Sequence, residues 1–115
     1  MVTGQDLRRL ALSLPHVIEK PHFERTGFRV AVPRGKIFAT MLEAQGSANL
    51  VLSPEEQHML CAAEPDMFFP VPNKWGEKGS TTIDLSKADE TTLTSALQMA
   101  WRRAAPEKLW SLLES

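Results

Sequence analysis

The sequence predicts a small α+β domain in which an antiparallel β-sheet is flanked by helices. Apolar residues recur with helical spacing near both ends of the chain, whereas short segments with strand-like alternation fill the middle. The expected strands follow one another through short loops, which favours antiparallel pairing over a doubly wound parallel sheet. The chain has 115 residues, a common length for one domain, so we expect a single domain over residues 1–115.

The first helix is expected over residues 4–14. Thr3 is a suitable N-cap, and Asp6 three residues later resembles a capping box. Pro15 then ends the helix, because proline has no amide hydrogen to donate. The apolar face of this helix carries Leu7, Leu10, Ala11 and Leu14.

Four segments are expected to be strands. Phe28–Val32 and Ile37–Leu42 form a hairpin around the turn 33–36, in which proline presets φ and glycine permits a positive φ. Ile37–Leu42 is apolar on both faces, which predicts a central position in the sheet. Asn49–Leu52 and Thr81–Leu85 are the third and fourth strands, and a β-branched run supports the fourth.

Capping signals predict two further helices. A short helix over residues 53–63 begins with serine, proline and two acids, which suit an N-cap, the first turn and the positive end of the helix dipole. The proline-rich stretch 65–72 is expected to be irregular. A long helix over residues 89–104 begins with an aspartate cap, and a last short helix follows Pro106. The apolar stripe of the long helix is Leu93, Ala96, Leu97, Ala100, Trp101 and Ala104.

Composition excludes several classes of protein. Hydrophobic residues make up 43% and charged residues 23%, values that are ordinary for a globular chain and unlike those of a disordered one. Cys61 is the only cysteine, so no internal disulfide forms. The N-terminus lacks the pattern of a signal peptide, and no apolar run reaches the roughly 18 residues that a membrane span needs. We therefore expect a cytoplasmic protein with no membrane contact.

Charge is unevenly distributed along the chain. The formal net charge is −1, whereas a dedicated nucleic-acid binder usually carries a basic excess. Residues 19–36 nevertheless hold five basic and two acidic residues, and residues 53–66 hold four acidic residues and no basic one. Surfaces of opposite sign result if these segments lie apart in the fold.

No arrangement of residues predicts a catalytic or metal site. His16, His22 and His58 lack the spacing of metal ligands, and no Cys-x-x-Cys motif is present. His58 precedes Cys61 by three residues, so the two share a helical face, but a small apolar role for the cysteine is favoured over nucleophilic catalysis. We expect no catalytic residue, no metal and no cofactor.

The segment around Trp75 is the most unusual in the chain. Trp75 lies between Lys74 and Gly76, in a loop that follows three prolines. A structural role would place the indole as a lid over one end of the core. A functional role would have it stack on a base or hold a partner, assisted by Lys74 and Lys78. The lid is favoured.

A basic cluster surrounds the first expected hairpin. Arg29 lies on the strand, and Arg34 and Lys36 mark the turn. Such a hairpin tip can enter a nucleic-acid groove as a wing. A solvated, edge-protecting cluster is the alternative, and the net charge of −1 favours it.

Taken in order, several short segments of the chain resemble the MmcQ/YjbR-like family over nearly its whole length. The resemblance implies a compact two-layer fold, similar to the CyaY-like or frataxin-like fold, and a predicted role in DNA binding. Iron binding, which frataxin-like folds also suggest, is not carried over, because Arg8 and Arg9 outnumber Asp6 on the first helix. The matching segments are Pro21-His22-Phe23, Phe28-Arg29-Val30, Gly35–Ala39, Leu52–Glu56, Trp75-Gly76 with Gly79, Ile83-Asp84-Leu85, Ala100-Trp101-Arg102 and Ala105-Pro106.

The leading interpretation is a non-enzymatic, monomeric binding protein that binds DNA weakly and without sequence specificity. Its expected contact residues are Arg29, Arg34, Lys36, Lys74, Trp75 and Lys78. The alternative is a protein-interaction or regulatory adaptor that uses the same surface. A small-molecule binder is the third interpretation and the least favoured.

Overall fold

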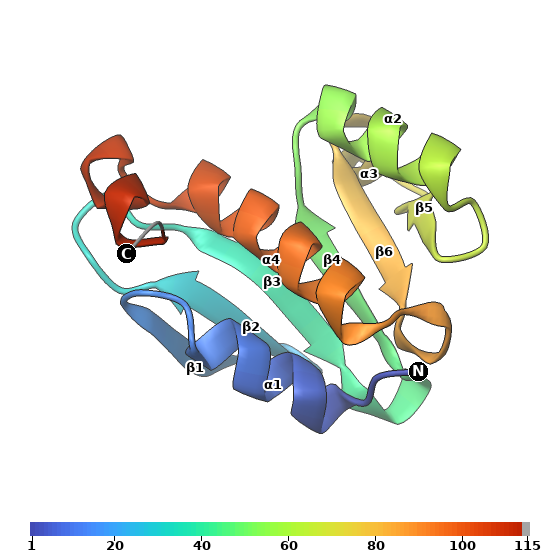
Figure 1. The fold of residues 1–115 in the computed structure, drawn as a ribbon, viewed down its shortest axis with the longest axis horizontal. Coiled ribbons are helices and arrows are strands. Elements are labelled where there is room, and N and C mark those ends of the chain that lie inside the picture. The colour runs from blue at the N-terminus through green and yellow to red at the C-terminus, as the bar shows by residue number, and fades with distance from the viewer. Residues whose placement is uncertain (114–115) are drawn as a thin grey trace.

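The computed structural model describes residues 1–113, and Figure 1 shows their arrangement. Six strands form one antiparallel sheet in the order β1-β2-β3-β4-β6-β5. The strands are β1 (Val17–His22), β2 (Arg25–Val30), β3 (Ile37–Leu42), β4 (Ser47–Val51), β5 (Phe68–Pro70) and β6 (Ser80–Asp84). The α-helices are α1 (Gly4–Leu12), α2 (Pro54–Ala63), α3 (Lys74–Glu77) and α4 (Glu90–Ala104), and the 3₁₀ turns are η1 (Glu43–Gln45), η2 (Leu85–Lys87) and η3 (Glu107–Leu113). The predicted α+β class, an antiparallel sheet with flanking helices, is confirmed.

Helices α1 and α4 lie side by side over one face of the sheet (Figure 1). The strand side chains beneath them form the core, and Phe28, Ala39 and Leu50 are among those with no exposed surface. Every residue of the apolar stripe predicted for α4 is buried. Trp101 is the largest of these, and its indole Nε1 donates a hydrogen bond to the Pro15 carbonyl at 3.0 Å. This bond joins α4 to the segment that follows α1.

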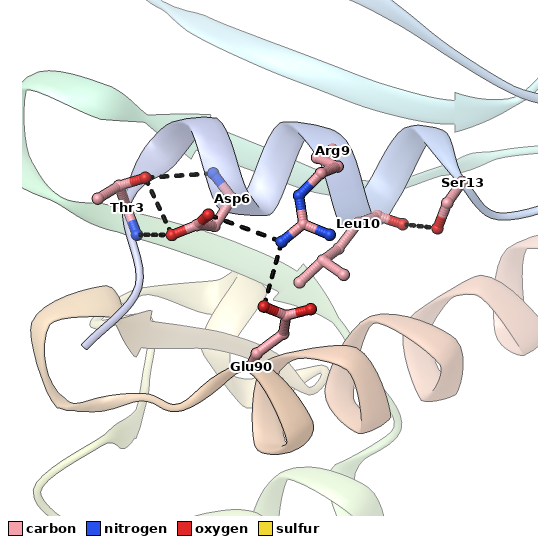
Figure 2. A network of polar contacts seen from close by, with 6 residues as sticks. All are labelled: Thr3, Asp6, Arg9, Leu10, Ser13 and Glu90. Atoms are coloured by element: carbon pink, nitrogen blue, oxygen red, sulfur yellow. Dashed lines mark hydrogen bonds and ion pairs between the residues drawn. The ribbon is translucent and has the colours of Figure 1, made fainter.

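Polar contacts at the start of α1 fix that helix and tie it to α4, as Figure 2 shows. Thr3 and Asp6 form the predicted capping box. The Thr3 backbone amide, followed by its hydroxyl, lowers the pKa of the Asp6 carboxyl by hydrogen bonding. Arg9 lies 3.7 Å from Asp6 and 3.1 Å from Glu90 in the first turn of α4. The contact between the helices therefore has a polar end as well as an apolar centre.

A β-bulge between β2 and β3 changes which side chains face the helices. Phe28 pairs with Ala39, but Arg29 pairs with Ile37, so Phe38 is an extra residue on β3. As a result Phe38 and Ala39 are both fully buried although they are neighbours. Ile37 lies on the opposite face, where its Cδ1 would be 2.7 Å from a Cβ on residue 27. Glycine at that position makes room for the Ile37 side chain.

Two strands were not expected from the sequence. β1 has five exposed residues out of six and contains Pro21, so it lacks the apolar alternation that marks a strand. β5 has only three residues and lies in the stretch 65–72, which was expected to be irregular. Both are edge strands, which explains why proline and exposure are tolerated in them. The four expected strands are present with boundaries shifted by up to three residues, and β3 is central as predicted.

Two predictions about the β2–β3 connection are wrong. The positive φ falls on Arg34, at 69°, and not on Gly35. Gly35 is needed for close approach instead, because a Cβ there would lie 2.0 Å from the Val30 carbonyl oxygen. The basic cluster also does not protect a sheet edge, because β1 covers β2 and leaves both strands of the expected hairpin inside the sheet.

Replacing Trp101 by alanine tests the packing of α4. The substitution removes a fully buried ring and the donor to Pro15, so we expect a loss of about 3–5 kcal/mol in the free energy of unfolding, measured with urea. Trp101→Phe keeps most of the volume and should cost less. A loss below about 1 kcal/mol for the alanine variant would show that α4 does not anchor the core.

Candidate functional groove

Among residues 1–113, no helix packs along the centre of the sheet face opposite α1 and α4, and this face remains partly exposed. Strand register places Gly27, Thr40 and Asn49 on this face as direct cross-strand neighbours. All its side chains on β3, β4 and β6 keep some exposed surface, whereas those on the other face are buried. A groove of about 870 Å³ crosses it. Its lining residues are His22, Phe23, Glu24, Arg25, Ile37, Thr40, Leu42, Asn49, Val51, Val71, Asn73, Trp75 and Ser80.

One end of the groove is the β1–β2 turn, residues 22–25, which we call the tip. Phe23 is 96% exposed and has a φ of 58°, a left-handed conformation that a bulky residue rarely adopts. Its ring meets His22 edge-on, with 5.0 Å between the ring centroids. Nη1 of Arg25 is shielded from solvent but has no hydrogen-bond partner, and no carboxylate among residues 1–113 forms an ion pair with this side chain.

The other end of the groove is the segment 73–79, which close contacts hold in place. Asn73 caps α3 by accepting hydrogen bonds from the amides of Trp75 and Gly76, at 2.8 and 3.4 Å. A Cβ on Gly76 would lie 1.7 Å from the Val71 carbonyl oxygen, so only glycine allows this approach. From α2, the Gln57 amide donates to the Gly76 and Ser80 carbonyls, both at 2.9 Å.

These contacts present Trp75 to solvent instead of burying it. Trp75 is 66% exposed, and the Lys78 ammonium lies 5.5 Å from the centre of its ring. The expectation of a lid over the core is therefore wrong. An exposed indole that has a cation beside it, on a backbone fixed by glycine and amide contacts, is suited to contact a ligand.

The six residues expected from the sequence form two separate groups. The tryptophan group, Lys74, Trp75 and Lys78, belongs to α3 and its C-cap. The hairpin group, Arg29, Arg34 and Lys36, lies at the β2–β3 connection, beside the end of α4. No hydrogen bond or ion pair within residues 1–113 joins the two groups, and only Trp75 of the six lines the groove.

Local contacts anchor the hairpin group. Arg29 lies on the open face and donates a hydrogen bond to the Gly35 carbonyl at 3.2 Å. The Lys36 amide donates to the Ala104 carbonyl at the end of α4, at 3.1 Å. Figure 1 shows β3 and β4 diverging from their connection at η1, and their ladder ends at Ala39 and Leu50. This divergence separates the hairpin group from the tryptophan group.

The sequence did not indicate the tip as part of the site. Phe23 and Arg25 lie in a segment that showed no strand pattern, so its turn could not be recognised. The available signal was an aromatic residue between a histidine and two charged residues, His22-Phe23-Glu24-Arg25, which is unusual for a residue expected to pack in a core.

Residues 1–113 show few features of a metal site, a reactive cysteine or a membrane span. Within residues 1–113, no group of three or more histidine, cysteine or acidic side chains is placed to hold a metal ion. Cys61 is partly buried on α2, and this burial raises the pKa of its thiol, which opposes nucleophilic reactivity. None of the helices in residues 1–113 has both the length and the apolar character that crossing a membrane requires.

The YjbR family model matches residues 12–103. The chain belongs to the YjbR family. A similar solved structure is the crystal structure of Deinococcus radiodurans protein DR2400, which carries a DUF419 domain. It shares 27% sequence identity with this YjbR chain, covers 88% of it and 77% of its own length, and has a TM-score of 0.72. No curated protein matches the chain.

Two substitutions test how the segment 73–79 is built. Trp75→Ala should change the free energy of unfolding by no more than about 0.5 kcal/mol, because the side chain is 66% exposed. Gly76→Ala should cost about 1–3 kcal/mol, because the new methyl group meets the Val71 carbonyl, although alanine is the better helix former. Urea denaturation measures both. Equal effects of the two substitutions would contradict the described backbone approach.

Proposed function

We propose that this protein is a non-enzymatic nucleic-acid-binding protein that holds single-stranded DNA along the open face of its sheet. The observation that carries the proposal is the groove that the exposed Trp75 lines, with the Lys78 ammonium 5.5 Å from the centre of the indole ring. Aromatic platforms with neighbouring cations bind single strands by stacking on bases and attracting phosphates.

A single strand suits this surface better than a duplex. The bases of a single strand are free to stack on side chains, whereas those of a duplex are already stacked on one another. A duplex would need a continuous basic face, but the hairpin and tryptophan groups lie apart. Arg29 on the open face extends the path of a strand from the groove towards Arg34 and Lys36.

The net charge of −1 points to weak binding. Non-specific complexes depend mainly on phosphate contacts and have dissociation constants of about 10⁻⁴ to 10⁻⁶ M at physiological salt. We propose that this protein lies in that range, acts as a monomer and works in the cytoplasm.

A protein partner is the second candidate. The observation in its favour is the apolar part of the groove, formed by Ile37, Leu42, Val51 and Val71. An apolar surface rimmed by charged residues is typical of a protein-binding site. In that case Trp75 would act as an aromatic anchor.

A salt series with a labelled oligodeoxythymidine strand, long enough to reach both groups, tests the proposal by fluorescence anisotropy. We expect five phosphate contacts, made by the three cations of the hairpin group and by Lys74 and Lys78. On a single strand, they give a slope of about −3.5 for the logarithm of the association constant against the logarithm of the salt concentration. Arg34→Ala with Lys36→Ala should reduce the slope by about 1.4, since two phosphate contacts are lost.

The control removes the same charge elsewhere. Lys87 is exposed on η2, outside both groups, so Lys87→Ala should leave the slope almost unchanged, whereas Lys36→Ala alone should reduce it by about 0.7. If the unchanged protein shows no binding even at low salt, DNA binding is excluded and the protein partner becomes the leading candidate.

A further inference from the structure

His22 pairs with Arg25, so the β1–β2 loop has two residues and needs a positive φ at its first position, but phenylalanine is a costly residue for that position. A left-handed backbone is unfavourable for a residue with a bulky side chain, and asparagine or glycine would adopt the φ of 58° more easily. Burial does not offset the cost, because Phe23 is 96% exposed and its ring meets the His22 ring edge-on. Strained residues that persist without a packing role are concentrated at binding sites.

Arg25, two residues after Phe23, has a second energetically unfavourable feature, an unpaired hydrogen-bond donor. Its Nη1 is shielded from water at the groove, yet no acceptor within residues 1–113 receives its hydrogen bond. Its cross-strand partner on β1 is His22, which supplies no negative charge. Glu24 lines the same groove but forms no ion pair with Arg25. A shielded donor on a charged side chain is expensive to leave unpaired. An anionic oxygen of a ligand in the groove would satisfy it.

We propose that the tip is a nucleotide subsite, in which Phe23 stacks on a base and Arg25 binds the phosphate attached to that nucleotide. The inference rests on the proposed single-strand function and assigns it a second anchoring point besides Trp75. Both residues line the same groove as Trp75, so one strand meets the two aromatic side chains in succession. Stacking uses the exposed ring, and a guanidinium pairs with phosphate oxygens through several donors.

The bottom of the groove between Phe23 and Trp75 also suits a nucleotide. The Asn49 side-chain oxygen accepts a hydrogen bond from the Thr82 hydroxyl at 2.7 Å, which fixes the amide within the groove. The amide nitrogen of Asn49 has no partner among the described residues, so it is free to donate to a base edge or a sugar oxygen. Apolar side chains around it accept the flat surface of a nucleotide.

Substitution of Phe23 separates binding from stability. Phe23→Asn relieves the left-handed strain, so its melting temperature should rise by roughly 2–8 °C, measured by circular dichroism. Its affinity for the oligodeoxythymidine strand should fall by about 5- to 150-fold, which is the loss of one base–aromatic stack. Phe23→Trp keeps a stacking surface and should retain the affinity. A structural role would instead lower the melting temperature of Phe23→Asn and leave its binding unchanged.

Substitution of Arg25 tests the phosphate contact. Arg25→Gln should reduce the salt slope by about 0.7, the value of one phosphate contact on a single strand. Lys87→Gln removes the same charge from an exposed site outside the groove and should change neither slope nor affinity. If the unchanged protein binds the strand but the Phe23 and Arg25 variants bind equally well, the tip proposal is wrong and the proposed function stands.

A mononucleotide distinguishes the remaining outcomes. Deoxythymidine monophosphate added to the unchanged protein should shift the amide resonances of residues 22–25 in NMR spectra. Deoxythymidine without the phosphate should shift them less, because Arg25 has no anion to bind. If the mononucleotide shifts the tip while no strand binds, the proposed function is wrong and the subsite stands. If neither ligand binds, both are wrong.

Discussion

The packing of α4 against one face of the sheet is the constraint on which the rest of the structure depends. Its buried stripe, in which Trp101 is the largest side chain, covers β3 and β4. The Pro15 carbonyl and the Arg9–Glu90 pair hold α1 beside it. α1 and α4 are both used on this face. The remaining helices, α2 and α3, pack near β5 and β6 at one end. The opposite face is therefore left partly exposed over its central strands, and it contains the groove.

The two faces differ because strand side chains alternate, and the bulge at Phe38 adjusts that alternation. The extra residue allows Phe38 and Ala39 both to enter the core and sends Ile37 to the groove, where Gly27 makes room for it. A glycine is also needed at the Trp75 end of the groove. There Gly76 allows the backbone of α3 to lie close to the Val71 carbonyl. The stability of the core and the form of the proposed site thus depend on different residues of the same strands. Substitutions of exposed groove side chains, such as that of Trp75, should therefore affect binding with little cost in stability.

Much of the fold could be predicted because its signals are local. The capping box at Thr3, the N-cap at Ser53 and the stripe of α4 each lie within a few helical turns, and all are present. β1 could not be predicted, because an exposed edge strand has no apolar pattern, and without β1 the turn at Phe23 was invisible. The site was only partly predictable. Trp75 was identified from its unusual neighbours, but the separation of the two basic groups depends on the divergence of β3 and β4, which no local pattern encodes.

The central claim is that the buried face maintains the fold and the open face binds the ligand. Amide NMR spectra of the protein, recorded with increasing amounts of the oligodeoxythymidine strand, test it most directly. We expect shifts that are confined to the tip, to Arg29 and residues 34–36, to the groove-lining parts of β3 and β4, and to residues 71–80, with the Trp75 indole resonance among the largest. Shifts centred on the exposed sides of α1 and α4, with the groove unchanged, would contradict it.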